Sequence, residues 1–396
     1  MHATQSIAQE EKQSGGLLRA VYVSSFLFAF HAALLAYIES SFLGTFLNDT
    51  LVGTVFALGS VASIVGLIAM PSLLNRYGNY RIIFSLILVE IISLAILASM
   101  KNPVWFLVPV FIVHLSIFPI ALFSMDIFLE SNTKNETTGK IRGVYLTAQN
   151  AAWLAPPLIA GLILTDGDYW KIFASAGVIL FPVLVIIFEK FNDFRDPPYA
   201  HIPLIGTLRE IWTRKDIYRI FMSNLLLSFF FSWMVIYTPL YLHKYMGMAW
   251  GDIGIIFTIM LVPFVLFGIP SGSLSDTRFG EKEMLSLGFL LMAITTGLLT
   301  FVTSKSVLLW AALLFMTRIG ATLVQTMNES YFFKQINASD AAIISVFRYT
   351  HPLGYLLGPL AASALLAFID FRFMFLILGI IVLYGLRYSL TIKDTK

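Results

Sequence analysis

The sequence predicts an all-α membrane protein with twelve transmembrane helices in two pseudo-symmetric six-helix bundles. The first observation is composition: 58% of the 396 residues are hydrophobic and 12% are charged, whereas charged residues alone approach about a quarter of a soluble domain. The second is a succession of apolar blocks of about 20 residues, each long enough to cross the hydrocarbon of a bilayer. The third is a repeat of the whole chain at a spacing of about 202 residues.

The apolar blocks predict the individual spans. We expect helices at 19–43, 51–74, 82–100, 104–129, 143–165, 170–189, 217–243, 252–274, 284–302, 306–333, 341–368 and 370–390. Helices are favoured because backbone groups in lipid must be satisfied within the segment, and the alternation of a barrel strand is missing from the sequence. Residues 1–18 lack the apolar core and cleavage site of a signal peptide, so we expect the first span to remain in the mature protein.

Positive charge predicts the orientation. With twelve spans, twenty of the 26 Lys and Arg residues fall on one side of the membrane, and the positive-inside rule places both termini in the cytoplasm. A net charge of +3 follows from this topology and gives no reason to expect a nucleic-acid partner. The chain has no cysteine, so disulfides and thiolate metal sites are excluded, and we expect no metal and no cofactor.

The repeat defines the domains. Gly53 aligns with Gly254, Gly78 with Gly280, and Asp126 with Asn328. Because each half holds an even number of spans, the halves are parallel repeats about an axis along the membrane normal. The predicted domains are a cytoplasmic tail at 1–18, a bundle at 19–190, a cytoplasmic linker at 191–216, a second bundle at 217–390 and a tail at 391–396. Apolar residues at helical spacing in the linker, from Leu204 to Trp212, predict a short amphipathic helix on the cytoplasmic surface.

A loop motif occurs once in each half. The chain reads PSLLNRYGNYR at 71–81 and GSLSDTRFGEK at 272–282. With its two six-helix halves, it resembles the major facilitator superfamily, whose signature between the second and third helices is approximately G-x-L-x-D-R-x-G-R-R. The first copy has Pro71 in place of the glycine and Asn75 in place of the acid, and the second copy retains Asp276.

The resemblance implies a network of charges at the cytoplasmic gate. The alternative is a set of solvated or snorkelling charges at helix ends. The candidate gate residues are Asp276, Arg278, Gly280, Asp126, Glu130, Arg142, Glu329, Arg348 and Arg76.

The fifth predicted span carries a partial match to the G-P-x-x-G-G signature of drug–proton antiporters. Here it reads PPLIAG from Pro156, Pro157 onward, and the eleventh span has Gly354, Gly358 and Pro359. The other interpretation is that small residues and prolines let helices pack closely and bend.

Polar residues inside spans are costly, so they indicate the substrate site. Arg318, His31 and His114 fall near mid-membrane, on spans that line the central cavity in the family that the chain resembles. Thr322 and Gln325 follow Arg318 on one helix face, while the repeat places Trp233 opposite His31, with Tyr237 one turn on. We expect these seven residues to bind substrate. The alternatives are a structural ion pair for Arg318 and hydrogen-bonded, neutral histidines.

Three residues are candidates for proton coupling, namely His31, Glu39 and Glu90. Glu39 is near the outer end of its span, where it could instead reach water. Glu90 is midway along a span that is peripheral in the family, where the alternative is a protonated acid bonded to Ser60 or Ser63.

Together these features predict a secondary transporter that works by alternating access, coupled to protons, in a bacterial inner membrane and as a monomer. No G-x-x-x-x-G-K-[ST], H-E-x-x-H or G-x-S-x-G motif occurs, so an ATP-driven pump or an enzyme is not expected. Two cargoes remain open: efflux of amphipathic compounds, favoured by the partial antiporter signature, and uptake of a small polar or anionic solute, favoured by Arg318 with the histidines.

Overall fold

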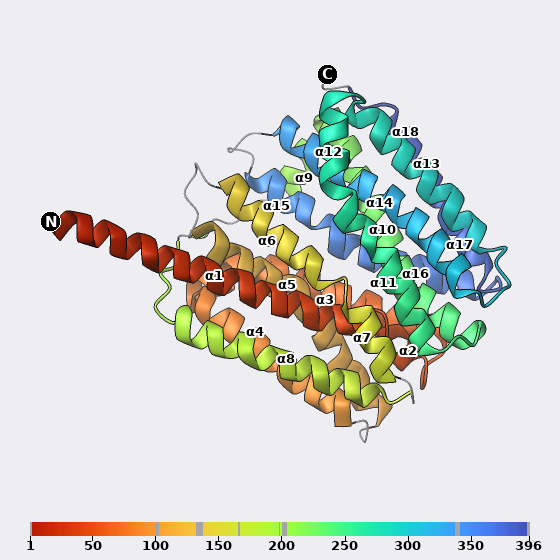
Figure 1. The fold of residues 1–396 in the computed structure, drawn as a ribbon, viewed down its shortest axis with the longest axis horizontal. Coiled ribbons are helices and arrows are strands. Elements are labelled where there is room, and N and C mark those ends of the chain that lie inside the picture. Colours follow the sequence, from red (N-terminus) through yellow and green to blue (C-terminus); the bar gives the residue numbers. More distant parts are fainter. Residues whose placement is uncertain are drawn as a thin grey trace. The chain divides into compact units, whose positions relative to one another are not determined.

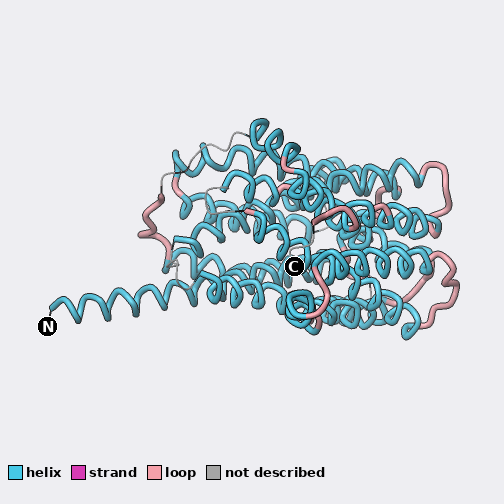
Figure 2. The backbone as a smooth tube through the Cα atoms, turned by 90° about the horizontal axis from the view of Figure 1, so that it is seen from above, coloured by secondary structure: helices cyan, strands magenta, loops and turns pink. Residues whose placement is uncertain are grey.

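The computed structural model describes residues 2–99, 103–131, 138–164, 167–197, 199, 204–336 and 341–393. Throughout these ranges the regular elements are helices, and no strand occurs among them. Figure 2, coloured by secondary structure, shows helices joined by loops. The all-α prediction is therefore confirmed.

Among the described residues, eight helices are long and apolar enough to cross a membrane. They are α1 (His2–Ala36, apolar from Gly16), α3 (Asp49–Tyr77), α4 (Asn79–Ser99), α5 (Val104–Ser131), α8 (Tyr169–Lys190), α10 (Lys215–Leu240, continued by the π-helix η3, Tyr241–Tyr245), α13 (Glu281–Leu299) and α14 (Val307–Gln335). The end of the first predicted span forms a separate short helix, α2 (Glu39–Leu43).

The remaining four predicted spans each consist of two helices. The pairs are α6 (Thr138–Ala152) with α7 (Pro156–Ile163), α11 (Trp250–Leu266) with α12 (Gly268–Thr277), α15 (Ala341–Arg348) with α16 (Thr350–Leu366), and α17 (Phe373–Leu383) with α18 (Gly385–Ser389). Proline explains the first break, because Pro156 disfavours helical geometry in the preceding residue and fits the first turn of the next helix.

The chain forms two compact units. Unit 1 comprises Met1–Leu35, Val65–Pro156 and Asp168–His201, and unit 2 comprises Ala36–Ile64, Pro157–Gly167 and Ile202–Lys396. The linker is therefore shared, since its first part belongs to unit 1 and its second part to unit 2. The domain boundaries expected from the repeat stay a prediction.

In unit 1, α4 packs along both α5 and α8, and Figure 1 shows α4 and α8 side by side. The core continues into the start of the linker. The Phe128 ring of α5 lies 4.3 Å from the Phe191 ring and 4.7 Å from the Phe194 ring, measured between centroids. The chain that leaves α8 is thus fixed against α5.

In unit 2, small residues bring helix backbones together. A Cβ on Gly320 of α14 would lie 2.7 Å from the carbonyl oxygen of Gly288 on α13. A Cβ on Gly354 of α16 would lie 2.5 Å from the backbone of Ser228 on α10, and one on Gly358 would overlap the Ser232 hydroxyl. Such close contacts favour helix association where lipid provides no hydrophobic driving force.

The amphipathic helix expected in the linker is α9 (Leu204–Thr213). It buries Thr207 and Ile211 and leaves Ile205 and Trp212 exposed. Part of its apolar surface is therefore exposed, and its place on the cytoplasmic surface stays a prediction. At its end Arg214 donates to the carbonyl of Gln335, 3.3 Å away, which ties α9 to α14.

Candidate functional site

Unit 1 contains a buried cluster of one carboxylate and two imidazoles. Oε1 of Glu90 on α4 lies 2.6 Å from Nδ1 of His114 on α5 and 3.4 Å from Nε2 of His31 on α1. The three side chains are between 2% and 6% exposed. The structure thus brings together three residues that the sequence marked separately, on three different helices.

The hydrogen-bond pattern of His31 makes this cluster able to hold an additional proton. Nδ1 of His31 contacts the carbonyl of Phe28, and because a carbonyl only accepts, this nitrogen carries a hydrogen. A neutral His31 would then turn the lone pair of Nε2 toward Glu90, which is favourable only when one of the two groups is protonated. The contact is therefore a place where a proton can be held.

The serines expected as alternative partners of Glu90 have other hydrogen bonds. The hydroxyls of Ser60 and Ser63 donate to the carbonyls of Phe56 and Gly59, at 3.0 and 3.1 Å. Oε2 of Glu90 is buried and has no hydrogen-bond partner among the described residues. The carboxylate therefore keeps one oxygen available for a proton.

Unit 2 contains an isolated buried cation. Arg318 of α14 is 1% exposed, and its Nε and Nη1 have no hydrogen-bond acceptor in the described part of the chain. Its guanidinium carbon lies 5.4 Å from the ring centroids of both Phe230 and Phe231 on α10. Tyr37 and Tyr355 are close enough to interact with it electrostatically.

No carboxylate of the described ranges forms an ion pair with this guanidinium, so the structural ion pair considered for Arg318 is not found there. Sequence reasoning missed Phe230 and Phe231, because they belong to a run of three phenylalanines that looks like ordinary lipid-facing surface.

The other predicted substrate residues differ in what they contact. The hydroxyl of Thr322 donates to the carbonyl of Arg318 at 2.7 Å, and that of Tyr237 donates to the carbonyl of Pro359 at 3.2 Å, so both serve the helices themselves. Trp233 is fully buried with no acceptor for Nε1 among the described residues. Gln325 is half-buried.

Glu39, the remaining proton candidate, is buried with 7% exposure at the start of α2. This burial corrects the suggestion that it simply reaches water at the end of its span. It lies near enough to Tyr355 to act on it electrostatically. Tyr355 is thus a neighbour of both Glu39 and Arg318 within unit 2.

The predicted gate residues form one ion pair that the structure describes. Arg348 Nη1 lies 3.5 Å from Glu329 Oε1, at side chains that are 49% and 39% exposed. The side chains of Asp276 and Arg142 lie outside the described residues, and Arg76 stacks over the ring of Tyr77. Arg278 and Glu130 are exposed, Asp126 is half-buried near Tyr145, and Gly280 is the N-cap residue that precedes α13. Sequence reasoning missed Glu281, a buried residue whose carboxylate forms an ion pair with Lys334.

A chain of long apolar helices with a buried titratable cluster and a buried cation has the features of a membrane transporter. The comparisons agree. The structure of the nucleoside transporter NupG is similar, with a TM-score of 0.75 at 10% identity, over 95% of this chain and 99% of that chain. The POT family transporter PepTSo gives a TM-score of 0.73 at 13% identity, over 94% and 96%.

A third similar structure is a bacterial homolog to the human lysosomal transporter Spinster, with a TM-score of 0.69 at 12% identity, over 96% of this chain and 93% of that chain. No curated protein matches by sequence. The family model of the Major Facilitator Superfamily matches residues 21–254 and 250–392. The chain therefore belongs to the Major Facilitator Superfamily and is an integral membrane protein that transports a small molecule.

Proposed function

We propose that this protein is a proton-coupled transporter that takes up an organic anion, with Arg318 binding the anion and Glu90, His31 and His114 holding the proton. The observation that carries the proposal is the buried guanidinium of Arg318, whose Nε and Nη1 find no acceptor among the described residues. An arginine keeps its charge in a protein, so these donors call for an anionic acceptor.

The energetics support an anion as that acceptor. An arginine at the centre of a membrane costs about 3 kcal/mol or more. Stacking on Phe230 and Phe231 offsets about 0.5–2 kcal/mol of this. A carboxylate or phosphate would form two parallel charge-assisted hydrogen bonds with the planar guanidinium. Binding of an anion therefore removes most of the remaining penalty.

The surroundings support a substrate with an apolar body. The aromatic faces of Phe230 and Phe231 flank the cation. On the same helix, α10, the Nε1–H of Trp233 has no acceptor among the described residues and adds a second donor that needs one. Every unsatisfied group named here in unit 2 is a donor. An organic acid with an aromatic or aliphatic body matches both the donors and the rings.

The sum of charges favours transport of anion and proton in the same direction. Counted over these two sites alone, the charge of Arg318 balances that of an ionised Glu90 when both are empty, and when both are loaded the anion balances Arg318 while the proton neutralises the Glu90 cluster. A carrier holding only one of the two has a net charge buried in the membrane, which is unfavourable. This balance supports symport, and hence uptake driven by an inward proton gradient.

Efflux of cationic amphipaths fits these groups less well. A cation would meet a fixed positive charge at Arg318, and like charges repel strongly where water is excluded. The prolines Pro156 and Pro157 begin α7, a position that proline favours for its backbone geometry alone. Dye efflux is therefore kept as an outcome of the test.

The test uses proteoliposomes with an imposed proton gradient and a pooled library of labelled organic anions. Wild type, Arg318→Lys and Arg318→Ala are compared for anion uptake and for efflux of a cationic dye. Arg372→Ala is the matched control, because Arg372 also stacks on a phenylalanine, 4.7 Å from the ring centroid of Phe373, but is exposed. We expect gradient-driven uptake in wild type and control, and a loss of about 100-fold or more in affinity for Arg318→Ala.

Arg318→Lys keeps the charge and loses the planar pair of donors, so we expect an intermediate loss of about tenfold, the value of one charge-assisted hydrogen bond of about 1.5 kcal/mol. Dye efflux that is equal in all variants, with no anion uptake, would overturn the proposal.

A further inference from the structure

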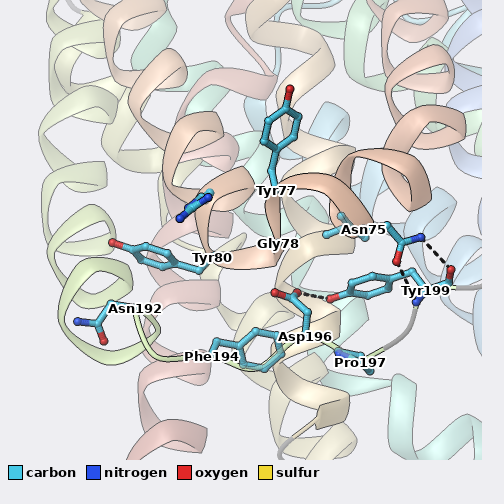
Figure 3. A pocket seen from close by; sticks show the side chains of 11 residues that line it. Asn75, Tyr77, Gly78, Tyr80, Asn192, Phe194, Asp196, Pro197 and Tyr199 are labelled. Atoms are coloured by element: carbon cyan, nitrogen blue, oxygen red, sulfur yellow. Dashed lines mark hydrogen bonds between the residues drawn. The ribbon is translucent and has the colours of Figure 1, made fainter.

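The carboxylate of Asp196, in the linker, binds the turn between α3 and α4. Its Oδ1 accepts a hydrogen bond from the backbone N–H of Asn79, the first residue of α4, at 2.8 Å, and another from the Tyr199 hydroxyl at 2.6 Å. Asn75 and Tyr199 form two further bonds, from the Asn75 amide to the Tyr199 carbonyl at 3.1 Å and from the Tyr199 N–H to the Asn75 side chain at 3.4 Å. Figure 3 shows Asp196, Tyr199 and Asn75 joined in this way.

The turn is shaped to receive this carboxylate. Gly78 has a φ of 79°, and a Cβ at this position would lie 2.6 Å from Oδ2 of Asp196. Only glycine combines the left-handed backbone with the space that the carboxylate occupies. Beside the contact, Asn192 and Phe194 of the linker and Tyr77 and Tyr80 line a cavity of about 550 Å³.

The two halves of the repeat obtain negative charge for the corresponding helix in different ways. Helix α13 has Glu281 and Glu283 in its first turn, whereas the first turn of α4 has no acidic residue. Because a helix N-terminus carries a partial positive charge, a carboxylate there is stabilising. In the first half this carboxylate comes from the linker, more than a hundred residues along the chain.

The linker has further contacts at both of its ends. Phe191 and Phe194 pack on Phe128 in unit 1, while α9 in unit 2 is tied to α14 through Arg214. Release of Asp196 and Tyr199 would therefore remove the contacts of this part of the linker with the α3–α4 turn.

We propose that Asp196 is a positioning residue, which docks linker residues 192–199 on the α3–α4 turn and so supplies the carboxylate that the first half lacks in its own helix. The docked linker moves with unit 1. This inference does not depend on the identity of the substrate.

The test measures docking by electron paramagnetic resonance of a spin label. The chain has no cysteine, so Arg195→Cys provides a single labelling site on an exposed linker residue next to Asp196. We expect an immobilised spectrum in the parent protein and a predominantly mobile one after Asp196→Ala. Asp196→Asn, which keeps the acceptor oxygen and loses the charge, should give a mixture. Asp193→Asn, at another exposed linker acid, should leave the spectrum unchanged.

A second variant changes the α3–α4 turn, which is the other partner of the contact. Gly78→Ala should also mobilise the label, because its Cβ would displace Asp196. Gly167→Ala controls for backbone strain, since Gly167 has a similar φ of 73° and nothing within 4 Å of an added Cβ. A label that stays immobilised in both Asp196→Ala and Gly78→Ala, in protein that is monodisperse by size-exclusion chromatography, would overturn the proposal.

Discussion

Oε1 of Glu90 lies 2.6 Å from Nδ1 of His114, while Oε2 of the same carboxylate has no hydrogen-bond partner among the described residues. One oxygen thus organises the cluster and the other is available to bind a proton. A buried carboxylate with an unused oxygen is costly, and such cost is typical of groups that change their protonation during a functional cycle. The asymmetry therefore supports Glu90 as the proton carrier, with the histidines as its partners.

Glu90→Gln should separate proton coupling from substrate translocation. Glutamine keeps the size and an acceptor oxygen but cannot bind a proton reversibly, so we expect uptake driven by a proton gradient to fall to background. Exchange of labelled for unlabelled anion across the membrane needs no net proton movement and should continue. Both rates are measured in the same proteoliposomes, with Glu189→Gln, at an exposed glutamate on α8, as the control. Equal loss of both rates would instead indicate a structural role.

The aromatic residues beside Arg318 should determine which anions are preferred. Phe230→Leu and Phe231→Leu remove a ring face 5.4 Å from the guanidinium and keep an apolar side chain. Aromatic pairs contribute about 0.5–1.5 kcal/mol beyond burial, so affinity for aromatic acids should fall about 2- to 10-fold, with little change for short aliphatic acids. Competition of both classes against one labelled anion measures this ratio, and an equal change for both would argue against a ring contact with substrate.

Helix contacts within unit 2 should be sensitive to a single methyl group. A Cβ on Gly254 of α11 would lie 2.6 Å from the carbonyl oxygen of Pro157 on α7. Overpacking of this kind costs about 1–3 kcal/mol, so Gly254→Ala should lower the midpoint of thermal unfolding in detergent. Gly251→Ala, three residues earlier on α11 with nothing within 4 Å of its Cβ, should leave the midpoint unchanged or raise it. A midpoint that is equal in the two variants would contradict the packing seen here.

Much of the fold could be predicted from sequence, because the apolar length of a helix is a property of a single segment. The breaks at Pro156 and Gly268 were harder to predict, since a window of mean hydropathy runs through them. Glu90, His31 and His114 could each be recognised as costly, but their meeting depends on how three helices are rotated about their axes. The aromatic neighbours of Arg318 resemble lipid-facing residues in sequence.

No sequence feature of Asp196 itself indicated the linker contact. Asp196 and Asn79 are 117 positions apart, and an aspartate before two prolines is ordinary turn composition. What the sequence did contain was the lost acid at Asn75 and the absence of acidic residues at the start of α4. The compensating group could be identified only when the linker and the turn were seen together.

The Tyr199 hydroxyl makes docking of the linker dependent on pH in the alkaline range. Burial, and the hydrogen bond to Asp196, raise the pKa of this phenol above its ordinary value of 10.0. Because the pKa is raised in the docked state, the neutral phenol stabilises docking fully below pH 10 and this contribution is lost only as the pH rises through the higher value. Arg81, Tyr77 and Tyr80 line the adjoining cavity and are unchanged in the comparison that follows.

The spin label at position 195 should therefore remain immobilised at pH 10.5 in the parent protein. Tyr199→Phe removes a hydrogen bond to a charged group, about 1.5–3 kcal/mol, so it should increase the mobile fraction already at pH 7.5, with no further step up to pH 10.5. The mobile fraction is followed from pH 7.5 to 10.5 in both proteins. Release of the label near pH 10 in the parent protein, at the pKa of a free phenol, would show that Tyr199 does not donate to Asp196 in the docked linker.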